Sequence, residues 1–177
     1  TDLLTRIDGL VVLAPGWKSC TQCVAMHDEG RRISPLELMR PGQALTFNYS
    51  TRQLASGWST PESWGTWSQG QQARIDLRLR PDSHSIVLDV MAFVQPQHPS
   101  QRVIVSLNGE QVLDTRLTQL QDTRLQIPIS AAIRQRLAVD DRLAIELQLP
   151  DAISPKQLGL NDDSRVLGLG LKRLTVN

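Results

Sequence analysis

Apolar and polar residues alternate along most of the chain after residue 70. In QARIDLRLR at residues 72–80, every second residue is apolar, which puts the apolar side chains on one face of a half-buried strand. Further strands are predicted at residues 44–50, 85–94, 101–117, 123–129, 142–150 and 165–177. Because many short strands are separated by turns, the pattern predicts an all-β fold, an antiparallel β-sandwich or jelly roll.

Local turn and capping signals divide these strands. Asn108-Gly109 is the dipeptide preferred in a type I′ turn, so residues 101–117 are predicted to form a β-hairpin. Ser130 is placed as the N-cap of one short helix over residues 131–138. The pattern therefore predicts two sheets and very little helix.

The last predicted strand contains Gly168 and Gly170. Glycine weakens a strand but lets another group approach its backbone closely. An aromatic ring lying across these glycines would explain why they are there.

Residues 1–43 are less regular than the rest of the chain. GLVVLA at residues 9–14 is a candidate edge strand, so we expect an N-terminal arm or edge strand that packs on a sandwich formed by residues 44–177. The chain opens without Met or an apolar leader, and we expect it to be a piece of a longer protein.

Charge and composition change this picture only by exclusion. The chain has 19 basic and 18 acidic residues, and the basic ones are scattered. This balance argues against a nucleic-acid partner and against a polybasic membrane patch. The longest apolar runs are too short to span a bilayer, so no membrane insertion by this fragment is expected.

Catalytic motifs are absent from the sequence. There is no G-x-S-x-G elbow, P-loop, H-E-x-x-H or dinucleotide fingerprint, so neither enzymatic activity nor a cofactor is expected of this fragment. His27, His84 and His98 have no motif around them and are expected at the surface. Asp162-Asp163 is interpreted as a solvated acidic loop in preference to a calcium site.

Cys20 and Cys23 are separated by two residues, and His27 follows four residues later. We rank a local Cys20–Cys23 disulfide first, free thiols second and a metal site third. A closed zinc site would need a fourth ligand, and no second C-x-x-C exists.

The stretch GWSTPESWGTWSQG at residues 57–70 carries Trp58, Trp64 and Trp67, with Glu62 among small polar residues. Exposed indole rings would offer flat apolar faces to sugar rings, with polar neighbours for the hydroxyl groups. Buried rings would instead close one end of the sandwich, with Glu62 satisfying an indole N–H or pairing with an arginine. The sequence leaves both interpretations open.

This stretch, together with the end of the chain, resembles a known family. The pattern is similar to the C-terminal periplasmic domain of the bacterial phosphoglycerol transferases that act on osmoregulated periplasmic glucans, and to modules of envelope glycosyltransferases. The matching residues are Gly57, Trp58, Ser59, Pro61, Glu62, Trp64, Gly65, Trp67, Ser68, Leu158, Gly159, Arg165, Leu167, Gly168, Leu169 and Gly170.

The resemblance covers residues 44–177 and implies a non-catalytic accessory domain with a fold like that of carbohydrate-binding modules. It implies a periplasmic location, a periplasmic glucan or other envelope glycan as partner, and a catalytic domain elsewhere in the same parent chain. The metals and nucleophile of that catalytic domain match no position here. A periplasmic setting also favours the Cys20–Cys23 disulfide.

The resemblance further suggests that Glu62 and Arg165 meet as a structural latch. We expect a bidentate ion pair under the tryptophans if the strands that carry the two motifs meet. The alternative is that Glu62 and Arg165 face a groove and bind sugar together with Trp58, Trp64 and Trp67. A further alternative is a purely structural module that packs against the catalytic domain with the tryptophans as core.

Overall fold

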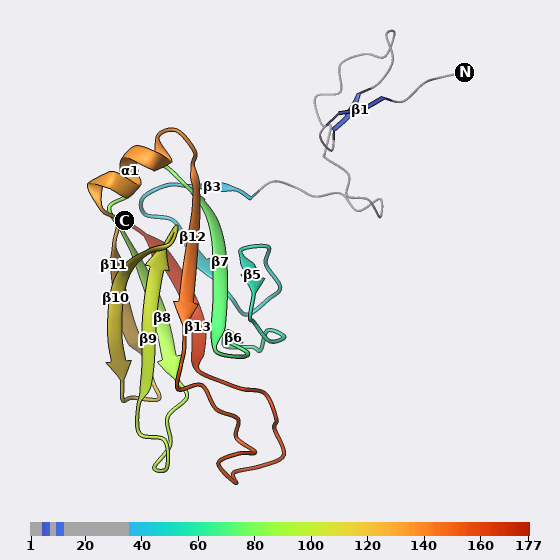
Figure 1. The fold of residues 1–177 in the computed structure, drawn as a ribbon, viewed down its shortest axis with the longest axis vertical. Helices are drawn as coiled ribbons and strands as arrows, with labels where there is room; N and C mark the ends of the chain where they lie inside the picture. The colour runs from blue at the N-terminus through green and yellow to red at the C-terminus, as the bar shows by residue number, and fades with distance from the viewer. Residues whose placement is uncertain (1–4, 8–9, 13–35) are drawn as a thin grey trace. The chain divides into compact units, whose positions relative to one another are not determined.

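The computed structural model describes residues 5–7, 10–12 and 36–177 (Figure 1). The chain divides into two compact units, Thr1–Leu36 and Glu37–Asn177. In the first unit, β1 (Thr5–Ile7) pairs antiparallel with β2 (Leu10–Val12), so the strand predicted at residues 9–14 has a partner within its own unit.

The second unit is an antiparallel β-sandwich with one short helix. Its elements are β3 (Leu38–Met39), β4 (Ala44–Thr46), β5 (Leu54–Ser56), β6 (Thr66–Trp67), β7 (Gln72–Leu79), β8 (Ser85–Ala92), β9 (Gln101–Leu107), β10 (Glu110–Leu117), β11 (Thr123–Pro128), α1 (Ala131–Leu137), β12 (Arg142–Gln148) and β13 (Leu169–Val176). The all-β fold class predicted from the sequence is confirmed.

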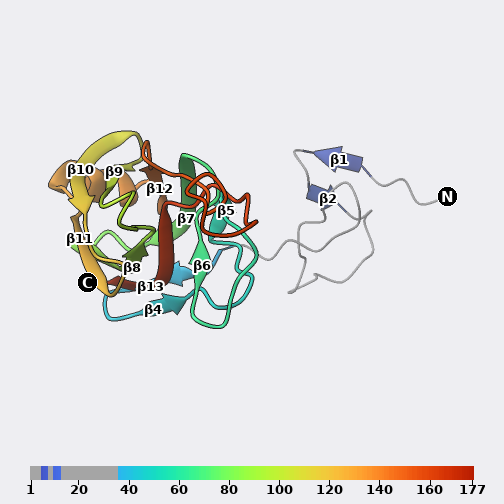
Figure 2. The same ribbon diagram turned by 90° about the horizontal axis from the view of Figure 1, so that it is seen from below.

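Two sheets form this sandwich. The β7 sheet has the order β10-β9-β12-β7-β3, with β5 also on β7, and the β8 sheet has the order β11-β8-β13-β4, with β6 also on β13. All pairs are antiparallel except β3 with β7. Figure 2, which looks along the strands, shows the two sheets facing each other.

The alternation in the sequence becomes the core between the sheets. In β7 and β12 the buried residues alternate with residues that reach solvent, and β8 repeats this pattern from the other side. Ile75, Leu88, Ile145 and Leu174 are each fully shielded from solvent. Fully burying an aliphatic side chain of this kind is worth roughly 1.5–3 kcal/mol, so this layer holds the two sheets together.

The hairpin and the helix cap form where the sequence predicts them. Asn108 and Gly109 have φ values of 48° and 82°, as a type I′ turn requires at its two central residues. The hydroxyl of Ser130 accepts a hydrogen bond from the backbone N–H of Ile133 at 3.2 Å and so caps α1.

Some predicted boundaries differ from the structure. The segment predicted as a strand at residues 44–50 is paired only over Ala44–Thr46, and the final strand begins at Leu169 rather than at residue 165. Leu38–Met39 already pairs with β7, so residues just before the predicted division at 43/44 lie in the sandwich. Such short parallel pairing between distant segments leaves no periodic signal in the sequence.

Candidate functional site

Trp67 belongs to the interior of the sandwich. It is 8 % exposed and packs edge-to-face on Phe93, with ring centroids 6.0 Å apart, and on Trp64 at 5.3 Å. Together with Leu167 these rings form a second, smaller core cluster. Trp67 therefore fills the fold, and it is not a surface platform for sugar.

Trp64 occupies a different environment on the same loop. It is half-buried, and its ring lies against the backbone of Gly170. A Cβ atom at Gly170 would come within 2.8 Å of both Cη2 of Trp64 and Cγ of Met91. The predicted aromatic ring over this glycine is confirmed, whereas Gly168 is approached by the aliphatic side chains of Leu149 and Ala152.

Trp58 is fixed by a third set of contacts. It is half-buried, packs against the main core, and donates from its indole Nε1 to the carbonyl oxygen of Arg74 at 2.9 Å. The three tryptophans that stand close together in the sequence thus have three different roles in the fold.

The two halves of the sequence signature lie in contact through β6 and β13. Trp67 is paired with Gly170, and the buried hydroxyl of Ser68 accepts hydrogen bonds from the backbone N–H groups of Leu169 at 2.9 Å and Gly168 at 3.3 Å. A side chain at Gly65 would collide with the carbonyl oxygen of Leu171 at 2.4 Å. Small residues at these positions allow the tryptophan loop to seat directly on the last strand.

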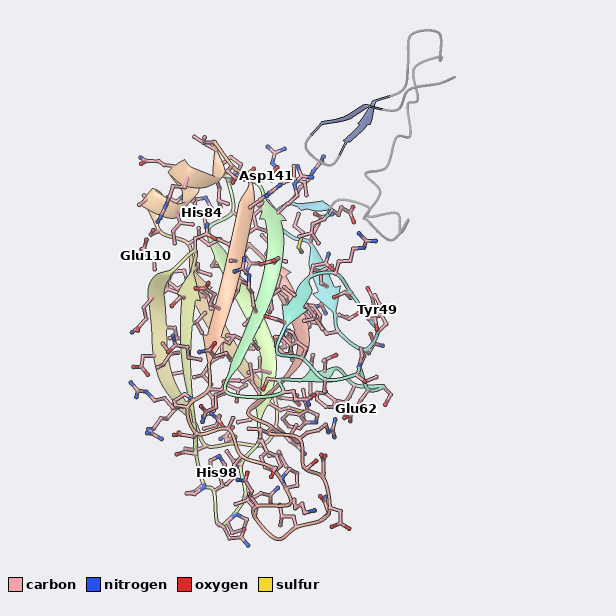
Figure 3. All side chains as sticks on the ribbon, turned by 45° about the vertical axis from the view of Figure 1, so that its right-hand side comes forward. Tyr49, Glu62, His84, His98, Glu110 and Asp141 are labelled. Atoms are coloured by element: carbon pink, nitrogen blue, oxygen red, sulfur yellow. The ribbon has the colours of Figure 1, made fainter. Side chains whose placement is uncertain are left out.

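Glu62 connects this loop to Arg165. Glu62 Oε2 accepts a hydrogen bond from Trp64 Nε1 at 2.9 Å, and Glu62 Oε1 accepts one from Arg165 Nη1 at 3.3 Å. Figure 3 labels Glu62 near the end of the sandwich that carries the long loop before β13. The carboxylate therefore holds the edge of the Trp64 ring.

The geometry of this pair differs from the expected one. The two-point contact of Arg165 goes to Asp163, through Nε at 3.1 Å and Nη2 at 2.7 Å, and a single bond goes to Glu62. The side chains of Arg165 and Glu62 are 36 % and 38 % exposed, so the expected bidentate, buried pair is corrected to a single, half-exposed contact. Hydrogen bonding from Arg165 lowers the pKa of Asp163.

A β-bulge lies on the outer side of β13. The pairing of β13 with β8 shifts between Leu171 and Arg173, so that Lys172 is the extra residue. Leu171 and Leu174 are both buried, and the two residues between them both line the outer surface. Bulges re-aim side chains and are common beside functional sites, and this one places Lys172 and Arg173 on one face.

These side chains line an open groove of about 560 Å³ on the outer face of the β8 sheet. The groove is lined by Thr46, Asn48, Ser63, Trp64, Asp89, Asp122, Thr123, Arg124, Lys172 and Arg173. It combines one aromatic side wall with hydroxyl, amide and charged groups.

The charges of the groove are only partly paired. Arg124 contacts Asp89 at 3.0 Å, and Lys172 contacts Asp122 at 2.5 Å and lowers the pKa of that carboxyl group by hydrogen bonding. Arg173 is exposed and makes no ion pair with any residue that the structure describes. It is the one groove cation without a carboxylate partner in residues 36–177.

Sequence reasoning found Trp64, Glu62 and Arg165 but missed the polar residues of the groove. A signal was present in LGLKRLTV, where two polar residues separate Leu171 from Leu174 and break the alternation. A break of this kind in a buried strand is the sequence sign of a bulge.

His84 and His98 are not part of the groove lining. His84 is exposed, while His98 is half-buried because its loop folds back in a bridge with Gln95, which corrects the surface position expected for it. Figure 3 shows these two histidines at opposite ends of the sandwich. His27, Cys20 and Cys23 lie outside the described residues, and so does the predicted disulfide.

Within residues 5–7, 10–12 and 36–177, no three His, Cys, Asp or Glu side chains are grouped as metal ligands. In the same part of the chain, no helix has the length and apolar character needed to cross a bilayer.

No family model matches the chain, and no curated protein matches it. Among solved structures, it is similar to the CBM36-1 domain of a multidomain xylanase from the hindgut metagenome of Trinervitermes trinervoides, with 11 % identity, 64 % of this chain and 77 % of that chain covered, and a TM-score of 0.39. A carbohydrate-binding module CBM36 in complex with calcium and xylotriose is similar with 12 % identity, 76 % and 88 % coverage and a TM-score of 0.40.

An acetyl xylan esterase from the rumen bacterium Butyrivibrio proteoclasticus is similar with 11 % identity, 75 % of this chain and 32 % of that chain covered, and a TM-score of 0.45. All three TM-scores are below 0.5, so these similarities carry no argument about function.

Proposed function

We propose that the sandwich is a non-catalytic accessory module that binds a glycan in the groove of the β8 sheet. The observation that carries this proposal is the position of Trp64, whose indole is fixed by Glu62 at one wall of a groove of about 560 Å³. A pre-positioned aromatic ring beside polar groups offers stacking to a sugar ring and hydrogen bonds to its hydroxyls.

The polar groups suited to sugar hydroxyls come from neighbouring strands and loops. Thr46 and Thr123 bring hydroxyl groups, and Asn48 brings an amide that both donates and accepts. Trp64 is the stacking residue in this proposal, whereas Trp67 supports it from below and Trp58 lies outside the groove lining.

The wider setting is part of the same proposal. We infer a periplasmic module of a phosphoglycerol transferase that engages a periplasmic glucan or envelope glycan for a catalytic domain of the same parent chain. The resemblance at both sequence motifs supports this inference, and so does the contact between those motifs across β6 and β13.

Glu62 and Arg165 serve in this proposal as a positioning pair. Glu62 accepts a hydrogen bond from the indole N–H of Trp64 and another from Arg165. Arg165 is in turn fixed by its hydrogen bonds to Asp163. The latch therefore sets the orientation of the stacking ring, and neither residue needs to touch the sugar.

An NMR titration of the full chain, followed at the resonances of residues 37–177, tests the proposal. With a linear β-glucan oligosaccharide at millimolar concentration, backbone and indole resonances of Trp64 and of β13 should shift, and Trp64→Ala should abolish these shifts. Gln148→Ala, on the outer face of the other sheet, is the matched control and should bind as the parent does. If no groove resonance of the parent protein moves with any glycan offered, glycan binding is refuted.

A purely structural role is the second candidate, because Trp64 and Trp67 pack together with Phe93 in one cluster. In that case the module packs against the catalytic domain and the tryptophans serve only as core. Tryptophan emission that resists an added quencher and ignores added glycan would favour this role over the groove.

A further inference from the structure

We propose that the groove is selective for a glycan that carries an anionic substituent, a phosphodiester or a carboxylate, and that Arg173 is the residue that contacts the anion. This inference rests on the proposed glycan binding and names the class of glycan. Its starting point is the bulge at Lys172, which adds a cation to the groove.

The bulge has a direct consequence for charge. In a regular strand that follows Leu171, the second residue would point into the core, and only one of Lys172 and Arg173 could face outward. The shifted register lets both face outward while Leu174 returns to the core. The groove therefore holds three cations against two carboxylates.

The pairing leaves Arg173 as the available cation. Asp89 is engaged by Arg124, and Asp122 is engaged by Lys172. Asp89 is also the strand neighbour of Arg173 on β8, yet it forms its ion pair with Arg124 on β11. The guanidinium of Arg173 thus keeps its donors for a group from outside.

Guanidinium chemistry defines the substituent. Its planar fork of donors matches the two oxygens of a carboxylate or phosphodiester, and such charge-assisted bonds are stronger than those to neutral hydroxyls. Thr46, the neighbour of Arg173 on β4, places a hydroxyl beside it in the same groove. A saccharide stacked on Trp64 would carry its charged substituent toward this pair.

On the opposite face of the sandwich, arginines are paired with carboxylates, so the unpaired state of Arg173 is not a general property of the protein surface. There, Arg74, Arg78, Arg102 and Arg116 each contact a carboxylate at 2.6–3.1 Å. The chain as a whole has a net charge of only +1, so a broad electrostatic attraction to polyanions does not account for the groove.

The test compares three probes on the full chain: a neutral β-glucan oligosaccharide, the same oligosaccharide carrying phosphodiester groups, and the same oligosaccharide oxidised to carry carboxylates. At low salt, at least one charged probe should bind about tenfold more tightly than the neutral one, because bonds to charged groups are stronger. The difference should shrink as salt is added. The probe that gains more identifies the source of the anion.

Arg173→Gln should remove the difference in affinity between the charged and neutral probes, so the readout is the ratio of the two affinities measured on the same variant. Arg116→Gln, on the opposite face, is the matched control and should change neither. Equal binding of all three probes by the parent protein would overturn the selectivity but leave glycan binding intact. Failure of every probe to bind would overturn both, and equally tight, Arg173-dependent binding of a short single-stranded oligonucleotide would overturn the glycan class.

Discussion

The two outer faces of the sandwich are built from similar alternating strands, but their side chains are arranged differently. On the outer face of the β7 sheet, which we call the paired face, arginines pair with carboxylates of the same face. Examples are Arg102 with Asp114 at 2.6 Å and Arg78 with Asp141 at 2.6 Å. On the β8 sheet, the surface is hollowed, Trp64 forms one wall, and Arg173 has no ion pair in the described part of the chain. Charged residues alone do not mark a binding site, whereas the shape of the surface and the pairing of its charges do.

Two local departures from regular pairing produce the difference. The bulge at Lys172 in β13 turns two cations to one outer face, whereas the bulge at Val112 in β10 of the other sheet adds no charged residue. β13 also accepts the loop that carries Trp64, because Gly170 leaves room for the ring.

Trp67→Ala should remove the support beneath the groove and destabilise the fold by about 3–5 kcal/mol, as expected for a buried tryptophan. Chemical denaturation followed by far-UV circular dichroism measures this loss. Arg74→Ala, on the paired face, should cost less than about 1 kcal/mol. Equal losses in the two variants would contradict the role of Trp67 as core.

Gly170→Ala should cost about 1–3 kcal/mol, because the added methyl group overlaps Trp64 and Met91. The indole N–H resonance of Trp64 should shift as the ring is displaced. Gly159→Ala has open space around its Cβ but a positive φ of 71°, so it reports backbone strain without ring displacement. An unmoved Trp64 resonance in Gly170→Ala would show that the ring does not lie where the structure places it.

Deleting Lys172 should remove the bulge from β13, so that the outer face of the β8 sheet resembles that of the β7 sheet more closely. Without the extra residue, Arg173 still faces outward and Leu174 still reaches the core, so the chain should fold. The loss of the backbone bond from Phe47 to the Lys172 carbonyl should cost about 1 kcal/mol. The loss in the free energy of binding a charged glycan should exceed the loss in the free energy of unfolding. Unchanged binding would show that the bulge has no part in recognition.

The pair of Glu62 and Arg165 should contribute up to about 1 kcal/mol, because both side chains are more than a third exposed. A double-mutant cycle with Glu62→Gln and Arg165→Met measures the coupling free energy by denaturation. Trp64 fluorescence should change in Glu62→Gln more than in Arg165→Met, because Glu62 contacts the indole directly. A coupling of the size seen for fully buried pairs would contradict the half-exposed geometry.

Lowering the pH should gradually remove the stability that the ion pairs of the paired face contribute. Hydrogen bonds from Arg102 and Arg78 lower the pKa values of Asp114 and Asp141 below the usual carboxyl range. The unfolded chain then binds protons first as pH falls, so the stability from these pairs is complete above about pH 4 and is lost as pH falls through the folded pKa values. A double variant carrying Asp114→Asn and Asp141→Asn should show a shallower fall in Tm below that pH.

Much of the fold was predictable because its signals are local. The alternation in β7, β8 and β12, the Asn108-Gly109 turn and the Ser130 cap all depend on residues close together in the sequence. The same holds for the inference of a ring packed on a strand glycine, which the contact of Trp64 with Gly170 confirms.

Tertiary structure decided the remaining features. Only the pairing of β6 with β13 buries Trp67 and leaves Trp64 at the groove, and only the geometry of Asp163 turns the fork of Arg165 away from Glu62. The groove itself gathers side chains from β4, β8, β11 and β13, which are far apart along the chain. Alternation fixes which face of a strand is buried, but exposure and charge pairing on the outer face depend on which distant strands lie next to each other.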